Sequence, residues 1–187
     1  MSTKGNKNKF KVIEKVGKEL SRKTIDFMVN KRIQEYGENT KDFNNSEQES
    51  IFFFLIEGNQ IKAFGMLKPV IIYYKNAGYP IMGMGNVIAI EKGKGYGIAL
   101  MEYTKDYLDK NNQVCIGNTH KDNFVFYQKC GFTFFHGFVN RFVYVDNQEK
   151  EHRGDWHDYT MFVYDKENKL KEVIRGSGNI IVKVPLW

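Results

Sequence analysis

The order of apolar and polar residues predicts strands and a helix in the first part of the chain. Residues 10–16 alternate between apolar and polar side chains, which is the period of a half-buried strand. Apolar residues then recur at helical spacing over 25–36, and a glycine follows as the predicted helix end. Residues 51–56 form an unbroken apolar run, typical of a buried strand. The turn residues 57–60 predict a hairpin into a second strand over 61–74.

The second part alternates between strands and helices before it ends in strands. The strands expected here cover 81–90, 113–119, 132–145, 159–164 and 180–184. One helix is expected over 98–108, where a wide apolar face repeats, and a short one ends at Gly131. Hairpins followed by alternating strands and helices predict an α+β domain with a mixed sheet.

Composition indicates one globular domain. The chain has 187 residues, 42% hydrophobic and 27% charged, which is enough for a core of its own. It has no run of about 18 apolar residues, so no transmembrane helix is expected. Residues 1–9 lack the apolar segment of a signal peptide and are predicted to be a flexible tail. A domain over 10–165 follows, and 166–187 is expected to be an extension that packs on this domain or on a partner chain.

The cysteines and the net charge indicate the cellular compartment and the kinds of ligand to expect. Cys115 and Cys130 lie among apolar residues with no Cys-x-x-Cys pair, so buried free thiols and a reducing cytoplasm are expected. A net charge of +6 suits anionic ligands in general. The basic residues do not cluster with aromatic ones in a known nucleic-acid motif, so no specific nucleic-acid binding is expected.

A glycine-rich turn between the strand over 81–90 and the helix over 98–108 is the clearest candidate for a ligand-binding site. Glycines permit positive φ angles and close approach, and a helix N-terminus leaves amides unpaired with partial positive charge. Lysines add full charges, so the turn is expected to bind a phosphate or pyrophosphate. The residues expected to form this anion cradle are Lys92, Gly93, Lys94, Gly95, Tyr96, Gly97 and Ile98.

The spacing in this turn excludes two common phosphate motifs. A dinucleotide fingerprint needs Gly-x-Gly-x-x-Gly, and its third glycine is missing whether counted from Gly93 or from Gly95. A P-loop needs Gly-Lys followed by Ser or Thr, but Gly95 follows Gly93-Lys94. A glycine loop that merely caps an ordinary helix remains the plain alternative.

Two motifs in order resemble the GNAT superfamily of acyl-CoA N-acyltransferases. In that family's signature Arg/Gln-x-x-Gly-x-Gly/Ala, Lys92 stands where Arg or Gln is usual, while Gly95 and Gly97 fit. Residues 123–132 resemble the later motif Asn-x-x-x-Tyr-x-x-x-Gly-Phe. The resemblance covers about residues 10–165.

The resemblance implies a fold and a cofactor site. The fold would be a mixed, mostly antiparallel central sheet of about seven strands flanked by helices. Strands four and five would splay apart around the pantetheine of acyl-CoA, with backbone groups of Val87, Ile88 and Ala89 pairing to it. Amides from Gly93 to Ile98 would hold the pyrophosphate. The stretch between Val87 and Lys92 is shorter than the family usually shows, which shifts these contacts by a residue or two.

The resemblance also implies a reaction, in which an acyl group, expected to be acetyl, moves from CoA to a primary amine by direct attack on the thioester. Tyr127 matches the family's general acid for the leaving sulfur, although a tyrosine packed on a helix edge is the ordinary alternative. Asn123 would contact the cofactor or simply start its helix. A CoA-binding sensor or interaction domain without catalysis is an alternative function, and a nucleic-acid-binding protein is another.

No catalytic base stands out. His120 is the preferred candidate because it should end the fifth strand, and a water chain is the alternative. The other candidates, each expected to be a surface residue, are Glu35, Glu57, Glu91, Asp155, His157 and Asp158. No metal is expected, since the histidines and cysteines show no ligand spacing. The loops Glu38–Ser50 and Asp146–Asp158, with Trp156 and His157, would shape the site of an unidentified acceptor, and a homodimer is left open.

Overall fold

A computed structural model describes residues 10–37, 43 and 47–184 of the chain. The predicted tail over 1–9, much of the loop Glu38–Ser50 and the last three residues lie outside the described residues. The chain divides into two compact units. The first comprises residues up to Met66 together with Asn86–Thr104, and the second comprises Leu67–Gly85 and everything from Lys105 onward.

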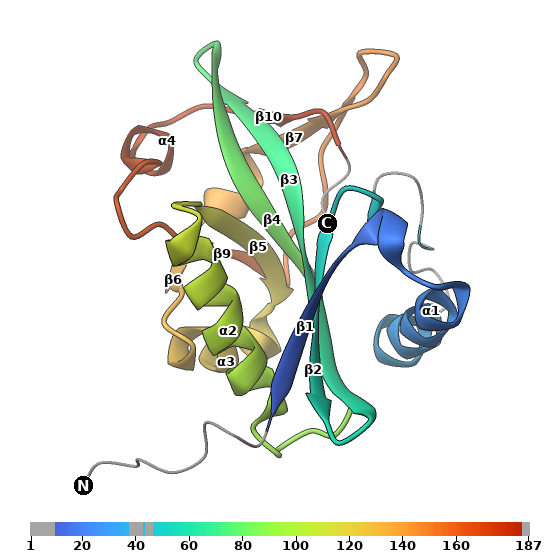
Figure 1. The fold of residues 1–187 in the computed structure, drawn as a ribbon. Coiled ribbons are helices and arrows are strands. Elements are labelled where there is room, and N and C mark those ends of the chain that lie inside the picture. The colour runs from blue at the N-terminus through green and yellow to red at the C-terminus, as the bar shows by residue number, and fades with distance from the viewer. Residues whose placement is uncertain (1–9, 38–42, 44–46, 185–187) are drawn as a thin grey trace, which may run out of the picture. The chain divides into compact units, whose positions relative to one another are not determined.

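The first unit is built on a hairpin and a helix. Its elements are β1 (Lys11–Val16), the short 3-10 helix Gly17–Glu19, α1 (Arg22–Tyr36), β2 (Ile51–Glu57) and parts of β3 (Gln60–Tyr74), β4 (Ala77–Ala89) and α2 (Tyr96–Lys110). β1 runs antiparallel to β2, as Figure 1 shows, and β2 also pairs with β3. α1 begins where the Ser21 hydroxyl accepts the Thr24 amide at 3.2 Å and ends at Gly37, whose φ is 89°.

The core of the first unit explains the unbroken apolar run in β2. The four consecutive side chains Phe52, Phe53, Phe54 and Leu55 are all at most 4% exposed, so both faces of the strand are covered. Arg32 of α1 forms a buried ion pair with Glu47, 2.9 Å between Nη1 and Oε2. This pair joins α1 to the segment that enters β2. Removing either partner would leave a buried charge uncompensated and would destabilise the fold.

The second unit contains the remaining elements. They are β5 (Cys115–His120), the 3-10 helix η3 (Lys121–Asn123), α3 (Phe124–Lys129), β6 (Thr133–Phe134), the 3-10 helix η4 (Phe138–Arg141), β7 (Phe142–Val145), β8 (Glu151–His152), β9 (Tyr159–Tyr164), α4 (Lys171–Arg175) and β10 (Ile180–Val182). Its strands are ordered β6-β9-β5-β4-β3-β10-β7-β8, so that β5 lies between β4 and β9 (Figure 1). β4 is parallel to β5 and β10 is parallel to β7, while the other pairs with a recorded register are antiparallel. None of the described helices is long and apolar enough to cross a membrane.

The α+β class with a mixed, mostly antiparallel sheet is confirmed, with ten strands in the described residues where about seven were expected. The continuous strand expected over 132–145 is wrong. Gly137 has a φ of 69°, and η4 then turns Phe138 and Val139 into the core, so only β6 and β7 remain as strands. The helix α4 was not anticipated, because its five residues are too few to show a period. β10 pairs with both β3 and β7, which makes Ile180–Val182 part of this sheet.

Candidate active site

A glycine turn joins the end of β4 to the start of α2. Just after β4, the Ile90 amide donates to the Lys62 carbonyl at 2.9 Å. Gly93 and Gly95 then have φ angles of 76° and 78°, in the left-handed region. A Cβ at either position would meet no described atom within 4 Å. Glycine is therefore required here for its backbone angles and not for lack of space. Because this requirement depends on residue type alone, the turn could be predicted from the sequence.

The first turn of α2 places further amides beside the glycines. α2 starts at Tyr96, and the Ala99 amide donates to the Gly95 carbonyl at 3.0 Å, which is the first bond of the helical ladder. Amides that precede this bond have no acceptor within the helix and carry partial positive charge. They belong to Tyr96, Gly97 and Ile98. Exposed glycine backbone and helix amides together are the components of an anion site.

Both lysines of the turn are exposed, and carboxylates lie near them. Lys92 forms a hydrogen-bonded ion pair with Glu35 of α1. Glu91 accepts a hydrogen bond from Lys62 at 2.8 Å, and this bond is the main reason that the pKa of Glu91 is lowered; the charge of Lys94 adds to the effect. Two of the glutamates considered as bases are therefore engaged in ion pairs at the turn.

Tyr96 ties the start of α2 to the end of β2. Its side chain is 6% exposed, and its hydroxyl donates to Glu57 Oε2 at 2.7 Å. That hydrogen bond is the first cause of a raised Tyr96 pKa, so the phenol stays protonated at neutral pH. The ring packs edge-on against Phe10, with 5.5 Å between centroids. Glu57 thus serves as the acceptor for a buried hydroxyl, a role that its place at a strand end did not reveal.

The end of β4 contains the residues expected to pair with pantetheine. Ile88 is buried, while Val87 and Ala89 are partly exposed. Just before them Asn86 has a φ of 55°, unusual for a non-glycine residue inside a strand. Its side-chain amide donates to the Met66 sulfur at 3.6 Å. A left-handed residue interrupts the regular geometry of the strand at Asn86, as happens at β-bulges, which often lie next to active sites.

Pairing between β4 and β5 is recorded over three residues. The register joins Met82 to Cys115, Gly83 to Ile116 and Met84 to Gly117. Both strands continue beyond the last of these pairs, β4 to Ala89 and β5 to His120. In the second unit β5 stays paired with β9 as far as His120 and Tyr159.

Tyr127 lies on α3 inside an aromatic cluster. Its side chain is 8% exposed. The ring stacks on Phe162 of β9, with centroids 4.1 Å apart, and meets Phe132 edge-on at 5.9 Å. Gly117 makes this arrangement possible, since a Cβ there would come within 2.2 Å of the Phe162 ring. Sequence reasoning missed both Phe162 and Gly117, because their contact crosses from β5 to β9.

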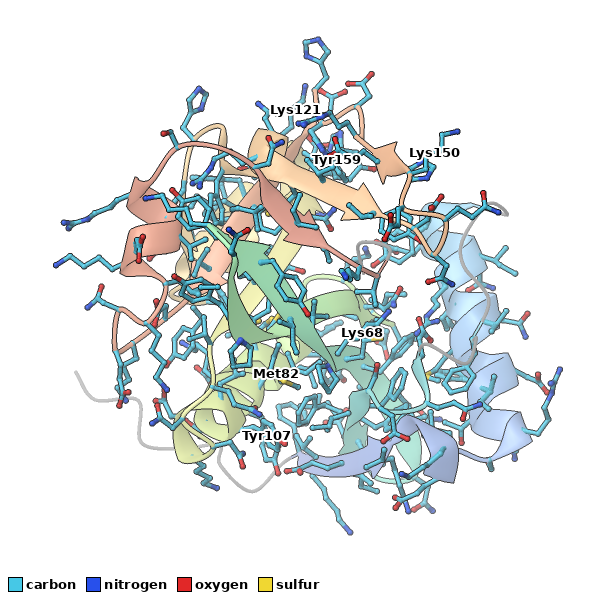
Figure 2. The ribbon with its side chains drawn as sticks, turned by 90° about the horizontal axis from the view of Figure 1, so that it is seen from above. Lys68, Met82, Tyr107, Lys121, Lys150 and Tyr159 are labelled. Carbon is cyan, nitrogen blue, oxygen red and sulfur yellow. The ribbon has the colours of Figure 1, made fainter. Side chains whose placement is uncertain are left out.

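His120 is the last residue of β5, where it was expected to lie. Its Nδ1 lies 3.4 Å from the Asp122 amide nitrogen and 3.1 Å from the Asp122 carboxylate, so it accepts from the amide in one tautomer and donates to the carboxylate in the other. Its ring meets Tyr159 edge-on, with 5.7 Å between centroids. Figure 2 shows Tyr159 beside Lys121, the residue that follows His120. In the tautomer in which Nδ1 donates to the Asp122 carboxylate, the ring is oriented by that carboxylate and Nε2 is the nitrogen left to accept a proton.

The loop before β9 holds the other acidic candidates. Asp158 pairs with Lys121, 2.6 Å between Oδ1 and Nζ, and this hydrogen bond lowers the pKa of Asp158. Asp155 accepts the His157 amide at 3.3 Å. Trp156 packs against the core of the second unit, and its buried Nε1 has no partner among the described residues. Asp158 is thus bound in an ion pair with Lys121.

Asn123 is the residue before α3. It is exposed, and it makes no side-chain cap on the helix. The helix therefore begins without help from this amide, whose donors and acceptor can face a ligand.

Comparison with solved structures identifies the fold. Escherichia coli ElaA aligns at a TM-score of 0.60 and 13% identity, over 83% of this chain and 99% of its own. An acyl-CoA N-acyltransferase from Pseudomonas aeruginosa aligns at 0.57 and 11% identity, over 82% and 98%. A conserved Enterococcus faecalis protein aligns at 0.54 and 18% identity, over 66% of this chain but only 32% of its own, so this chain spans about a third of that protein. No protein-family model matches the sequence, and no curated protein does.

The chain has the GNAT fold. Within this GNAT-fold chain the predicted site residues fall into two groups. The glycine turn and the end of β4 belong to the first unit, and His120, Asn123 and Tyr127 belong to the second. No three His, Cys, Asp or Glu side chains gather closely enough to hold a metal ion in the part of the chain that the structure describes.

Proposed function

We propose that this protein is an N-acetyltransferase that moves an acetyl group from acetyl-CoA to a primary amine. The GNAT fold supports the choice of an acyl-CoA donor. The glycine turn supports it independently, because left-handed glycines before a helix start suit a diphosphate. That turn, with Gly93 and Gly95 at positive φ, is the single observation on which the proposal depends most.

In the proposed reaction the diphosphate of acetyl-CoA lies on the amides from Gly93 to Ile98 and near Lys92 and Lys94. The pantetheine follows the backbone of Val87, Ile88 and Ala89, as an added strand would. The left-handed angle of Asn86 supports this role, since it interrupts regular strand geometry just before these residues. Asn123, free of any capping role, would contribute a polar contact to the cofactor.

The proposed chemistry is direct attack. A free alkyl amine has a pKa of about 10.4, so most of it must lose a proton before it can attack. His120 would accept that proton, directly or through water. The amine nitrogen then bonds to the thioester carbon, and the carbon–sulfur bond breaks. Tyr127 would donate a proton or hydrogen bond to the departing sulfur, and the products are an amide and CoA.

The acceptor is a primary amine whose structure the chain does not specify. The cytoplasm is the proposed location, since Cys115 and Cys130 are buried free thiols. Longer acyl-CoA donors should be included in the same test. The glycine turn is proposed to bind the diphosphate, which all acyl-CoA molecules share, so it does not select the length of the acyl chain.

The test is calorimetric titration with CoA and acetyl-CoA, followed by turnover with a panel of amines, polyamines and peptides while thiol release is recorded. Binding followed by amine-dependent thiol release is expected. Binding without turnover for any amine would favour a CoA-binding sensor. A protein that binds neither CoA nor acetyl-CoA would refute the proposal.

A further inference from the structure

Two side chains from the β2–β3 hairpin reach the two ends of the glycine turn. Before the turn, Glu91 accepts a hydrogen bond from Lys62 of β3 at 2.8 Å. After the turn, Tyr96 donates to Glu57, the last residue of β2, at 2.7 Å. Lys62 also lies over the Tyr96 ring, with 5.8 Å between Nζ and the centroid. The turn is thus held on both sides by one hairpin, and all four residues belong to the first unit.

The Tyr96 contact is the more enclosed of the two. The tyrosine is 6% exposed, and a buried hydroxyl without a partner would be unfavourable. Its acceptor comes from a strand 39 residues earlier in the chain. Because Tyr96 is the first residue of α2, this bond sets where the first helical turn lies relative to β2.

Electrostatics alone does not explain these contacts. Glu57 and Glu91 place two carboxylates beside a turn whose amides and lysines suit an anion, and carboxylates repel anions. Lys62 forms an ion pair with Glu91, and Glu57 accepts the neutral Tyr96 hydroxyl. The charge of a carboxylate beside the turn does not itself favour an anionic ligand, whereas the hydrogen bond from Tyr96 to Glu57 fixes the position of the start of α2.

We propose that the Glu57–Tyr96 and Lys62–Glu91 contacts form a clamp that positions the glycine turn and the first turn of α2 for the diphosphate of CoA. The inference rests on the proposed function. Tyr96 and Glu57 are positioning residues in this scheme, because they act through the backbone of α2 and not on the ligand. The clamp holds the amides in the geometry that binding requires before the ligand arrives.

The chain contains a matched control for the Tyr96 contact. Tyr103 lies on the same helix, and its hydroxyl donates to Glu14 of β1 at 2.6 Å. This is again a tyrosine–glutamate hydrogen bond within the first unit, but it is remote from the glycine turn along α2. Tyr103→Phe therefore removes a comparable bond without touching the clamp.

The first experiment compares Tyr96→Phe and Tyr103→Phe with the wild type by titration with CoA and with dephospho-CoA, which keeps the diphosphate. Tyr96→Phe is expected to weaken both ligands about tenfold, the usual scale for losing a hydrogen bond to a charged group. Tyr103→Phe is expected to leave both affinities unchanged, and because its bond is exposed it should lower the melting temperature by no more than Tyr96→Phe does. Hydrogen exchange in the ligand-free protein should speed up over residues 93–98 only in Tyr96→Phe.

The second experiment separates position from charge. Glu57→Leu removes both the acceptor and the negative charge. A clamp predicts weaker CoA binding in Glu57→Leu, whereas a purely electrostatic role predicts tighter binding because a repelling charge is gone. Glu57→Gln keeps an acceptor oxygen and is expected to bind CoA better than Glu57→Leu.

The outcomes distinguish this inference from the function on which it rests. If the wild type binds no CoA, the proposed function fails and the clamp fails with it. If the wild type binds CoA and Tyr96→Phe binds it equally well, only the clamp is overturned. Tighter binding by Glu57→Leu would also overturn the clamp alone.

Discussion

The ring of Tyr127 stacks on the ring of Phe162, with centroids 4.1 Å apart and planes inclined by 19°. This contact joins α3 to β9 and fixes the plane of the tyrosine that we propose as the general acid. Gly117 lies opposite Phe162 in the β5–β9 pairing and has no side chain to displace its ring. The orientation of Tyr127 thus depends on a glycine in a different strand.

Removing the Tyr127 hydroxyl should slow turnover without weakening CoA binding. Tyr127→Phe keeps the ring that stacks on Phe162, so the fold and the cofactor contacts should persist. General acids contribute about 10²- to 10⁴-fold, and turnover should fall within that range. Steady-state kinetics and CoA titration measure the two effects separately. Tyr164→Phe, which loses a hydroxyl bonded to Asp109, is the control and should keep normal turnover. Full turnover in Tyr127→Phe would show that Tyr127 only packs.

A methyl group at Gly117 should disturb the aromatic cluster. Its Cβ would lie 2.2 Å from the Phe162 ring, so the ring must move. Overpacking of this kind costs about 1–3 kcal/mol, and thermal or urea unfolding of Gly117→Ala should show it. The control is Gly78→Ala, whose nearest contact would be a flexible Ile71 methyl at 3.3 Å. Equal stability of the two variants would contradict the packing described for Phe162.

A branched side chain at Gly95 should abolish CoA binding. Gly95 has a φ of 78°, which valine adopts only with strain, and its side chain would stand where the ligand approaches. Gly178→Val is the matched control, since Gly178 has a φ of 96° with equally open surroundings but lies in the second unit. Both variants should lose stability, and only Gly95→Val should lose CoA affinity by calorimetry. Normal affinity in folded Gly95→Val would rule out this cradle.

Protonation of Asp109 in acid should lower the free energy of unfolding. Its carboxylate accepts bonds from Lys166 at 2.8 Å and from Tyr164 at 2.9 Å, and these bonds, that of Lys166 foremost, lower its pKa. A lowered folded-state pKa gives stability that is complete above the ordinary value of 3.8 and is lost as the pH falls through the folded value. Wild type and Asp109→Asn should therefore differ in unfolding free energy at neutral pH, begin to converge as the pH falls below about 3.8, and become equal below the lowered folded-state pKa. Asp106→Asn, which loses no bond to a described residue, should track the wild type.

Both thiols should resist modification in the native protein. Cys115 and Cys130 are at most 3% exposed, and burial raises the pKa of the Cys115 thiol. A disulfide reagent should find no fast thiol before unfolding and two thiols in denaturant. Ser177→Cys adds a thiol at an exposed position and should give one fast thiol. A fast thiol in the wild type would contradict the burial of both cysteines, and it would also raise the background of the CoA-release assay.

Elements with a strong local period were predictable. The apolar run of β2 and the wide apolar face of α2 specify a strand and a helix without reference to the rest of the chain. The glycine turn was predictable for a similar reason, because the demand for positive φ at Gly93 and Gly95 is met by residue type alone. The resemblance to the GNAT family depended on these same local motifs.

The prediction of a continuous strand over residues 132–145 was wrong because this stretch has no local pattern that identifies its structure. Apolar residues fill this stretch, and nothing in their order separates a strand from a compact turn. Phe138 is 3% exposed and meets Phe142 edge-on at 5.3 Å, so the core of the second unit selects a 3-10 turn there. The left-handed Gly137 permits that turn, and a glycine alone does not reveal it.

The sequence by itself determined the strands and helices that have a clear local pattern, such as β2 and α2, and the glycine turn between β4 and α2, since these follow from residue order and from the angles each residue tolerates. Only the tertiary structure decided which carboxylates are engaged and how the aromatic rings face. Glu57 and Tyr96 are 39 residues apart, and their bond exists because β2 and the start of α2 fold together. Contacts of this kind depend on the positions of whole elements, so they cannot be predicted from a local pattern in the sequence.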